Sequence, residues 1–179
     1  MKFLAVLFLL ICTPPNEEVV VSWSAENNLT WGDFKAEAKP NADEAALTAS
    51  GITFGFSVRK SSEGNYVSFD SKVEAHFYPE KSWYVKERAS SYILAHEQLH
   101  FDLTELYVRK LRHGISKLKI SPAIKENLRA LHAAANKELA EMQQQYDLET
   151  DHSRRIGKQA YWSAFVEKEL YKLRGFASK

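Results

Sequence analysis

The chain has 179 residues, with 24 basic against 23 acidic side chains. This near balance excludes a strong electrostatic field that would draw the protein to nucleic acid or to an anionic membrane surface. A hydrophobic share of 45% and an aromatic share of 12% exclude a disordered polar chain, and the length suits one domain that folds without help from a metal or a disulfide.

The N-terminal segment, MKFLAVLFLLICTPP at residues 1–15, has the composition of an export signal. One lysine precedes an unbroken apolar run from Phe3 to Ile11, which is too short to span a bilayer as a stable helix. We expect this signal to be removed, which leaves a single mature domain over residues 16–179. The expected location is outside the cytoplasm, secreted or in the periplasm or cell envelope.

Cys12 is the only cysteine of the chain, so the mature domain is expected to contain no internal disulfide. A lipid anchor at Cys12 is the alternative to simple cleavage of the signal, and it would make the protein a lipoprotein. Ile11 is a poor fit at the position before a lipidated cysteine, where a small residue is usual. We therefore favour simple cleavage.

The first half of the mature chain carries the patterns of an antiparallel sheet. VVVSW at residues 19–23 is rich in β-branched side chains and predicts a first short strand. Apolar and polar residues alternate over residues 52–58 and again over 67–77, which is the period of a strand with one buried face. SSEGN between them supplies a turn. The pattern predicts a long antiparallel hairpin.

The period of the apolar residues changes after Pro79. They recur every three or four positions from about residue 90 to residue 113, which predicts a helix capped by Gly114. Similar stripes predict a second helix that begins at Ser121 and a third over residues 155–173. Because the strands come first and the helices last, the sequence predicts an α+β fold, with an N-terminal antiparallel sheet and a helical C-terminal part.

The first predicted helix contains HEQLH at residues 96–100. Residues four apart lie one turn above each other, so His96 and His100 can present two imidazole nitrogens to one ion, and zinc accepts imidazole ligands. Glu97 lies beside the pair, where its carboxylate can accept a proton from an attacking water. This is the HExxH pattern of zinc peptidases, here on an otherwise apolar face where two unpaired histidines would be costly to bury.

A catalytic zinc needs a third protein ligand and an open fourth position. The extended HExxHxxGxxH pattern is excluded, because Leu103 and Leu106 occupy its glycine and third histidine. A second helix that returns antiparallel can bring its C-terminal end against the first helix. We predict His152, just past that helix, as the third ligand, with Glu149 as the main rival. For Asp147 two interpretations stay open: a partner that orients a ligand histidine, and an exposed acid.

Four segments of the chain together resemble a bacterial family known as domain of unknown function 922: WGDF at 31–34, AALTASGI at 45–52, HEQLHFDLTE at 96–105 and YDLETDHS at 146–153. Gln159 and Trp162 look similar too. Members are generally described as predicted secreted zinc-dependent proteases, so the resemblance implies export and a zincin-like metallopeptidase architecture. It maps the family pattern to eight residues: His96, Glu97, His100, Tyr146, Asp147, Glu149, Thr150 and His152. Ser153 departs from that pattern, where we expect glycine.

The prediction from the sequence is therefore an exported zinc metallopeptidase, a hydrolase that cleaves a peptide or protein substrate. His96, His100 and His152 are the predicted ligands of Zn²⁺, and Glu97 is the predicted general base. We expect no nucleic-acid partner and no transmembrane helix in the mature chain.

Two other interpretations of HEQLH stay open. In the first, the protein is a non-catalytic envelope protein whose zinc only holds the helices together, which a fourth protein ligand such as Glu149 or Asp151 would favour. In the second, the histidines bind no metal and make only local hydrogen bonds, so that a chelator would leave the thermal stability unchanged.

Overall fold

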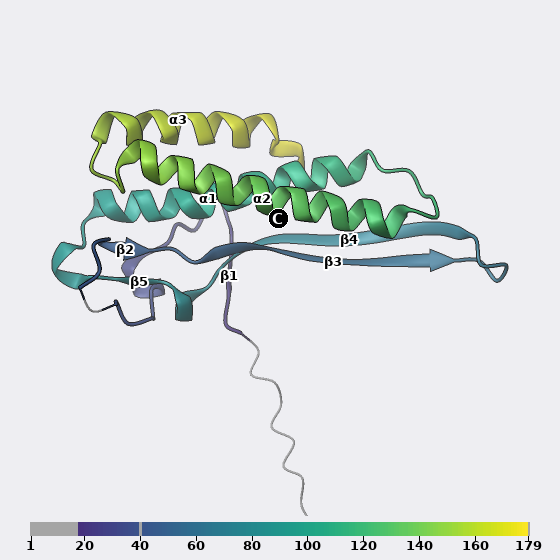
Figure 1. Ribbon diagram of the computed structural model, residues 1–179, viewed down its shortest axis with the longest axis horizontal. Coiled ribbons are helices and arrows are strands. Elements are labelled where there is room, and N and C mark those ends of the chain that lie inside the picture. Colours follow the sequence, from purple (N-terminus) through teal and green to yellow (C-terminus); the bar gives the residue numbers. More distant parts are fainter. Residues whose placement is uncertain (1–17, 40, 179) are drawn as a thin grey trace, which may run out of the picture.

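The computed structural model describes residues 18–178 apart from residue 40, so the predicted export signal and Cys12 lie outside the described residues. Three helices form a layer over a long β-hairpin, and α3 lies on the side of that layer away from the strands (Figure 1). Sheet and helices follow each other along the chain, which confirms the predicted α+β fold. No helix in the described part of the chain combines the length and the apolar character needed to cross a bilayer.

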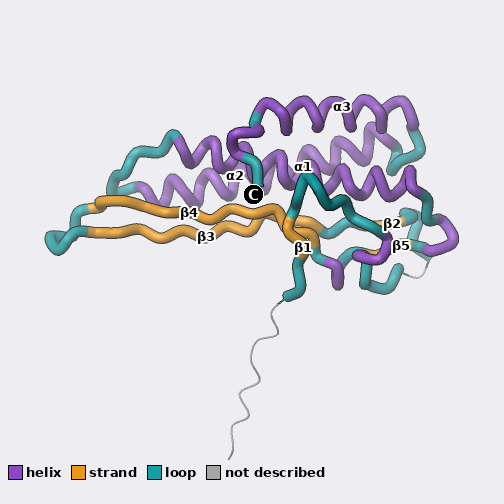
Figure 2. Tube along the Cα trace, turned by 180° about the vertical axis from the view of Figure 1, so that it is seen from behind, coloured by secondary structure: helices purple, strands orange, loops and turns teal. Residues whose placement is uncertain are grey.

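The hairpin consists of β3 (Ser50–Lys60) and β4 (Tyr66–Phe77), paired antiparallel with Ile52 opposite Ala75. Gly64 in the connecting turn has φ 85°, a left-handed conformation that glycine adopts without steric cost. β1 (Val21–Ser22) pairs with the other edge of β4, next to Phe77. The predicted hairpin and first strand are confirmed. Figure 2 shows how far the hairpin extends beneath the helices.

A second, two-stranded sheet lies beside the N-terminal end of α1. It pairs β2 (Ala46–Leu47) antiparallel with β5 (Trp83–Tyr84). The sequence did not predict it, because two-residue strands carry no periodic signal. The end of β2 is fixed to α1 by Thr48, whose hydroxyl donates a hydrogen bond to the carbonyl of Glu97 over 3.2 Å.

The helices are α1 (Ser91–Ser116), α2 (Ile124–Thr150) and α3 (Ile156–Lys172), close to the predicted ranges. The sequence predicted that Gly114 caps the first helix, but the residue lies inside α1. A Cβ at position 114 would lie 3.5 Å from a methyl group of Leu131, an ordinary van der Waals distance, so Gly114 lies at the contact between α1 and α2. The second helix begins at Ile124 rather than Ser121.

α1 is the central helix of the fold. It packs against the hairpin, α2 and α3, so residues such as Leu103 and Leu106 are fully buried. Its buried Glu105 accepts hydrogen bonds from Arg109 and from both the backbone and the side chain of Ser178. A buried carboxylate with this many donors is well compensated, and it ties the C-terminal segment to α1. The HEQLH segment thus lies on a helix that packs against the hairpin, α2 and α3.

Candidate metal centre

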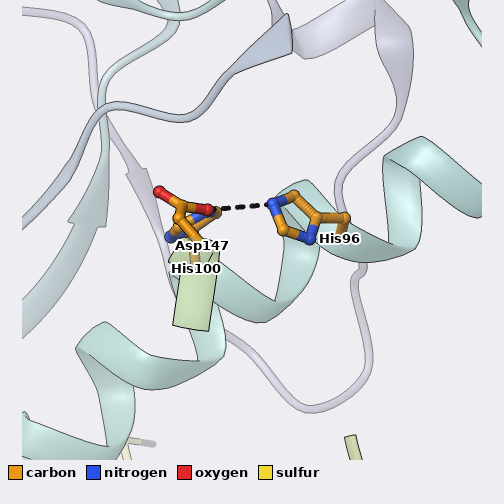
Figure 3. Close-up of side chains that lie close together, drawn as sticks. All are labelled: His96, His100 and Asp147. Carbon is orange, nitrogen blue, oxygen red and sulfur yellow. Dashed lines mark hydrogen bonds and ion pairs between the residues drawn. The ribbon is translucent and has the colours of Figure 1, made fainter. Parts of the chain in front are cut away.

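His96 and His100 lie one turn apart on α1 and are 3% and 8% exposed. Asp147, near the C-terminal end of α2, points its carboxylate toward both rings (Figure 3). Its Oδ1 atom lies 3.1 Å from His96 Nε2 and 2.9 Å from His100 Nε2. One ligand atom from each of the three residues falls within 4.8 Å of the others. The antiparallel return of α2 therefore brings a carboxylate to the two histidines of HEQLH.

The donor chemistry of this group fits a cation. The other ring nitrogen of His96, Nδ1, lies 2.9 Å from the amide oxygen of Gln159, which can only accept a hydrogen bond. A neutral His96 that donates from Nδ1 turns the lone pair of Nε2 toward the Asp147 carboxylate, which is unfavourable without a positive charge between them. Two imidazole nitrogens and one carboxylate oxygen are ligands that Zn²⁺ binds. This buried group can hold a metal ion.

The electrostatics keep Asp147 ionised. Burial alone would raise the pKa of its carboxyl, but its contacts with His100 and His96, which act as hydrogen bonds and as charges when these rings are protonated, bring the pKa far below its usual range. For His100 the balance runs the other way: burial lowers the pKa, while the hydrogen bond to Asp147 and the negative charges of Asp147 and Glu97 raise it, with a net increase. The carboxylate is thus available as a ligand, and a proton on His100 competes with a metal.

Tyr146 forms a wall behind the two histidines. Its fully buried ring stacks on His96, with 4.5 Å between ring centroids, and meets His100 edge-on at 5.0 Å. Its hydroxyl donates to the amide oxygen of Gln159 over 2.7 Å, and burial raises its pKa, so it stays protonated. The hydroxyl is engaged away from the cleft. The ring contributes packing that limits the orientations open to the imidazoles.

Glu97 lines a cleft of about 280 Å³ together with His96, His100 and Asp147. The residue is only 4% exposed. Within the part of the chain that the structure describes, its carboxylate has no hydrogen-bond or ion-pair partner. A carboxylate that lines a cleft beside two histidines without being paired is typical of sites where such a group acts on a ligand. The apolar side of the cleft is formed by Leu47, Trp83 and Ile93.

His152 lies at the rim of the same cleft and outside the group of three. Its side chain is 47% exposed, and its Nδ1 lies 3.9 Å from Asp147 Oδ1. Its assignment as a metal ligand stays a prediction. Glu149, the rival candidate, does not line the cleft but accepts hydrogen bonds from Gln145 and from the indole of Trp162. Asp151 forms an ion pair with Arg154.

Asp147 is the residue whose place the sequence left undecided. A signal for it exists in the spacing on α2: Gln143, Asp147 and Thr150 follow one another at intervals of four and three, directly beside the buried stripe that includes Leu139 and Tyr146. Gln143 lines the cleft too, and its amide donates to the carbonyl of His100 over 3.4 Å. A polar row beside the apolar stripe thus marks the face that α2 turns to the site.

The turn after α2 is left-handed at three successive residues, with φ of 51° at Asp151, 49° at His152 and 74° at Ser153. Residues with a Cβ adopt this conformation at a cost of roughly 1–2 kcal/mol each. The family resemblance led us to expect glycine at position 153, and glycine adopts a positive φ without this cost. The turn carries His152 to the rim of the cleft.

We expect Ser153→Gly to stabilise the protein, because glycine adopts a positive φ without that steric cost. After the entropic cost of glycine in the unfolded chain, the free energy of unfolding should rise by roughly 0.5–1 kcal/mol. Thermal denaturation of the metal-free protein measures this. Ser153→Ala keeps the Cβ and is the control that should not stabilise. Equal melting temperatures for the glycine and alanine variants would contradict the account of strain at this turn.

Comparison with known proteins gives one family. A family described as bacterial protein of unknown function (DUF922) matches residues 36–153, which include β2, the hairpin, α1 and α2. No curated protein matches the chain, and no solved structure matches it either. The matched segment contains HEQLH, Asp147 and His152, so it carries the ligand group and its rim. Because the match covers well over half of the sequence, the chain belongs to this bacterial family of unknown function.

Proposed function

We propose that the protein is a zinc-dependent peptidase in which His96, His100 and Asp147 hold the metal and Glu97 is the general base. The observation that carries this proposal is the position of Glu97: its carboxylate has no partner among the described residues and lies on the wall of the same cleft as His96, His100 and Asp147. Three protein ligands leave one coordination position open, as catalytic zinc sites require. The export signal would place this activity outside the cytoplasm.

Bound zinc would polarise the carbonyl of the scissile peptide bond and lower the pKa of a water molecule in the site. Glu97 would accept the proton of the attacking water and then deliver it to the leaving amine. The buried surroundings of Glu97 strengthen its interaction with any positive charge in the cleft. Asp147, which stays ionised, would balance part of the metal charge. The residues of this chain thus supply the ligands, the base and the wall of the cleft.

The edge of β2 offers a place for an extended peptide. Val85 N–H donates to the carbonyl of Ala45 over 2.8 Å, so in the antiparallel alternation the N–H and C=O of the next residue, Ala46, point away from β5. Ala46, Leu47 and Thr48 line the cleft with the ligand group. A peptide that pairs with this edge as an added strand would pass beside Glu97. This favours a peptide or protein substrate over a compact small molecule.

The rival function, a structural zinc that only holds the helices together, requires a fourth protein ligand. The two acids named for that role, Glu149 and Asp151, bond to other partners. The remaining candidate is His152. A zinc site closed by His152 in addition to Asp147 would therefore support the structural role. Experiment can distinguish this closed site from the open site of a peptidase.

The proposal is tested by metal exchange on the purified full chain. We expect about one zinc per chain by elemental mass spectrometry and cleavage of a mixed library of quenched fluorescent peptides. Removing the metal with a chelator should abolish cleavage and lower the melting temperature, and adding zinc back should restore both. A protein that binds zinc but cleaves no member of the library, with or without excess zinc, would favour the structural role.

Zinc affinity is expected to fall as the pH drops, because the raised pKa of His100 makes its proton compete with the metal already above pH 6.5. The stability of the metal-free protein depends on pH in the opposite direction. A raised pKa in the folded state stabilises the metal-free protein most fully below the unfolded value of 6.5, and this contribution disappears as the pH rises through the folded value. Asp147, whose pKa is lowered, stabilises the fold above about pH 3.8 and loses this effect only as the pH falls further.

The increase in melting temperature caused by zinc should therefore grow steadily from pH 5.5 to pH 8. Thermal denaturation with and without zinc across this range measures the difference. A zinc effect independent of pH would show that His100 does not exchange a proton for the metal.

A further inference from the structure

We infer that Gln159 is a positioning residue that fixes the proton of His96 on Nδ1 and so keeps Nε2 free for a metal. The inference rests on the proposed metal site but concerns a different helix. Gln159 lies in the first turns of α3, outside the segment that the family matches, and is 63 residues away from His96 along the chain. Its side chain is almost completely buried.

The amide oxygen of Gln159 has two close neighbours. It lies 2.9 Å from His96 Nδ1 and 2.7 Å from the hydroxyl of Tyr146. An amide oxygen accepts hydrogen bonds and cannot donate, so both neighbours must donate to it. A neutral imidazole carries one proton, on either of its two nitrogens. With that proton on Nδ1, the lone pair of Nε2 faces Asp147 Oδ1, where the ligand group converges.

The nitrogen of the same amide shows that this orientation has a cost. Gln159 Nε2 is buried and has no hydrogen-bond partner among the residues that the structure describes. An unsatisfied buried donor is unfavourable. The amide nevertheless presents its oxygen to His96 and Tyr146. We attribute this to the requirement for an acceptor at His96, since an NH₂ group in that place would donate to Nδ1 and move the proton to Nε2.

The consequence is that the metal site extends into α3. His96 is held by three different elements: α1 carries it, Tyr146 from α2 stacks on its ring, and Gln159 from α3 sets its protonation. Substitution of a residue that hydrogen-bonds to a metal ligand usually lowers metal affinity by roughly 10- to 100-fold. Without Gln159, the proton of His96 is free to move to Nε2. There it would donate a hydrogen bond to Asp147 and block the nitrogen from binding a metal.

The test compares Gln159→Leu, which removes the acceptor but keeps similar bulk, with Gln159→Glu, which keeps an oxygen in its place. Zinc affinity is measured by competition with a chromophoric chelator, and the protonated nitrogen of His96 is identified in the metal-free protein by ¹⁵N NMR of the imidazole at pH 8. We expect the leucine variant to bind zinc about 10- to 100-fold more weakly and to shift the proton of His96 to Nε2. The glutamate variant should retain the Nδ1 proton and bind zinc.

The control is Ser163→Ala. Ser163 lies one turn further along α3 and donates to the backbone carbonyl of Gln159 over 3.0 Å, so this variant perturbs the same helix but leaves the amide in place. Its zinc affinity and the protonation of His96 should match the wild type. A role of Gln159 in packing alone would lower the melting temperature of the leucine variant without moving the proton of His96.

Unchanged zinc affinity together with an unchanged Nδ1 proton in the leucine variant would overturn the inference. A metal-free wild type whose neutral His96 carries its proton on Nε2 would overturn it as well, even if the leucine variant failed to fold. These outcomes differ from failure of the proposed function. A wild type that binds no zinc would remove the metal centre, whereas the NMR measurement would still decide what Gln159 does to His96.

Discussion

Asp147→Ala is expected to bind zinc at least about 100-fold more weakly than the wild type. Removing a hydrogen-bond partner of a metal ligand costs roughly 10- to 100-fold in affinity, and this substitution removes a proposed ligand itself. Asp147 Oδ1 is the atom on which both imidazole nitrogens converge, at 2.9 and 3.1 Å. The expected antiparallel return of the second helix predicted instead that His152 is the third ligand, with Glu149 as the rival. The same experiment on His152→Ala separates the two assignments.

We expect His152→Ala to retain about one zinc per chain, because His152 is half exposed and lies outside the group of three. Metal content by elemental mass spectrometry and dissociation constants by competition are measured for both variants. Asp151→Ala is the matched control, since Asp151 belongs to the same turn but pairs with Arg154 on the surface. Zinc lost in the His152 variant and retained in the Asp147 variant would establish the sequence-based ligand set.

A loss of affinity in both variants, with zinc retained in the Asp151 control, would show four protein ligands. That closed site would favour the structural role over the peptidase. The comparison of Asp147 with His152 therefore decides the ligand set and, with it, the class of protein.

The parts of the fold that the sequence predicted are those with a repeated pattern. The alternation from Ile52 onward gave the hairpin, and the stripes of three and four gave all three helices, because each of these elements is long and buries one face. Gly114 was misassigned because a glycine near the end of an apolar stripe resembles a cap. The structure instead places it inside α1, in contact with Leu131 of α2. Local sequence does not contain that contact.

The residues of the candidate site also fall into those that a repeated local pattern predicts and those that depend on the tertiary fold. His96, Glu97 and His100 were predicted because the helix alone fixes their relation. The positions of Asp147 and His152 depend on where α2 ends and how the next turn bends. Three consecutive left-handed residues determine that bend, and none of them is a glycine that would mark it in the sequence. Gln159 could be recognised as a neighbour of His96 only once α3 was packed on α1.

Glu97→Gln is expected to lower peptide turnover by about 10²–10⁴-fold, the usual contribution of a positioned general base, while the metal stays bound. The substitution keeps the size of the side chain and removes its ability to accept a proton. Glu97 has no partner in the described part of the chain that would be left uncompensated, so the fold should tolerate the change. Zinc content and turnover of the peptide library are measured on the same preparation.

Glu149→Gln is the matched control for this experiment. Glu149 is the other glutamate that the sequence placed near the site, and its carboxylate bonds to Trp162 on the side of α2 that faces α3. Its loss should leave turnover close to the wild-type value. Full turnover in the Glu97 variant would reject Glu97 as the base and would require another titratable group that lines the cleft, such as His152 or Glu44. Loss of zinc and turnover together would instead show that Glu97 is needed to hold the metal, because its negative charge raises the affinity of the cleft for a cation.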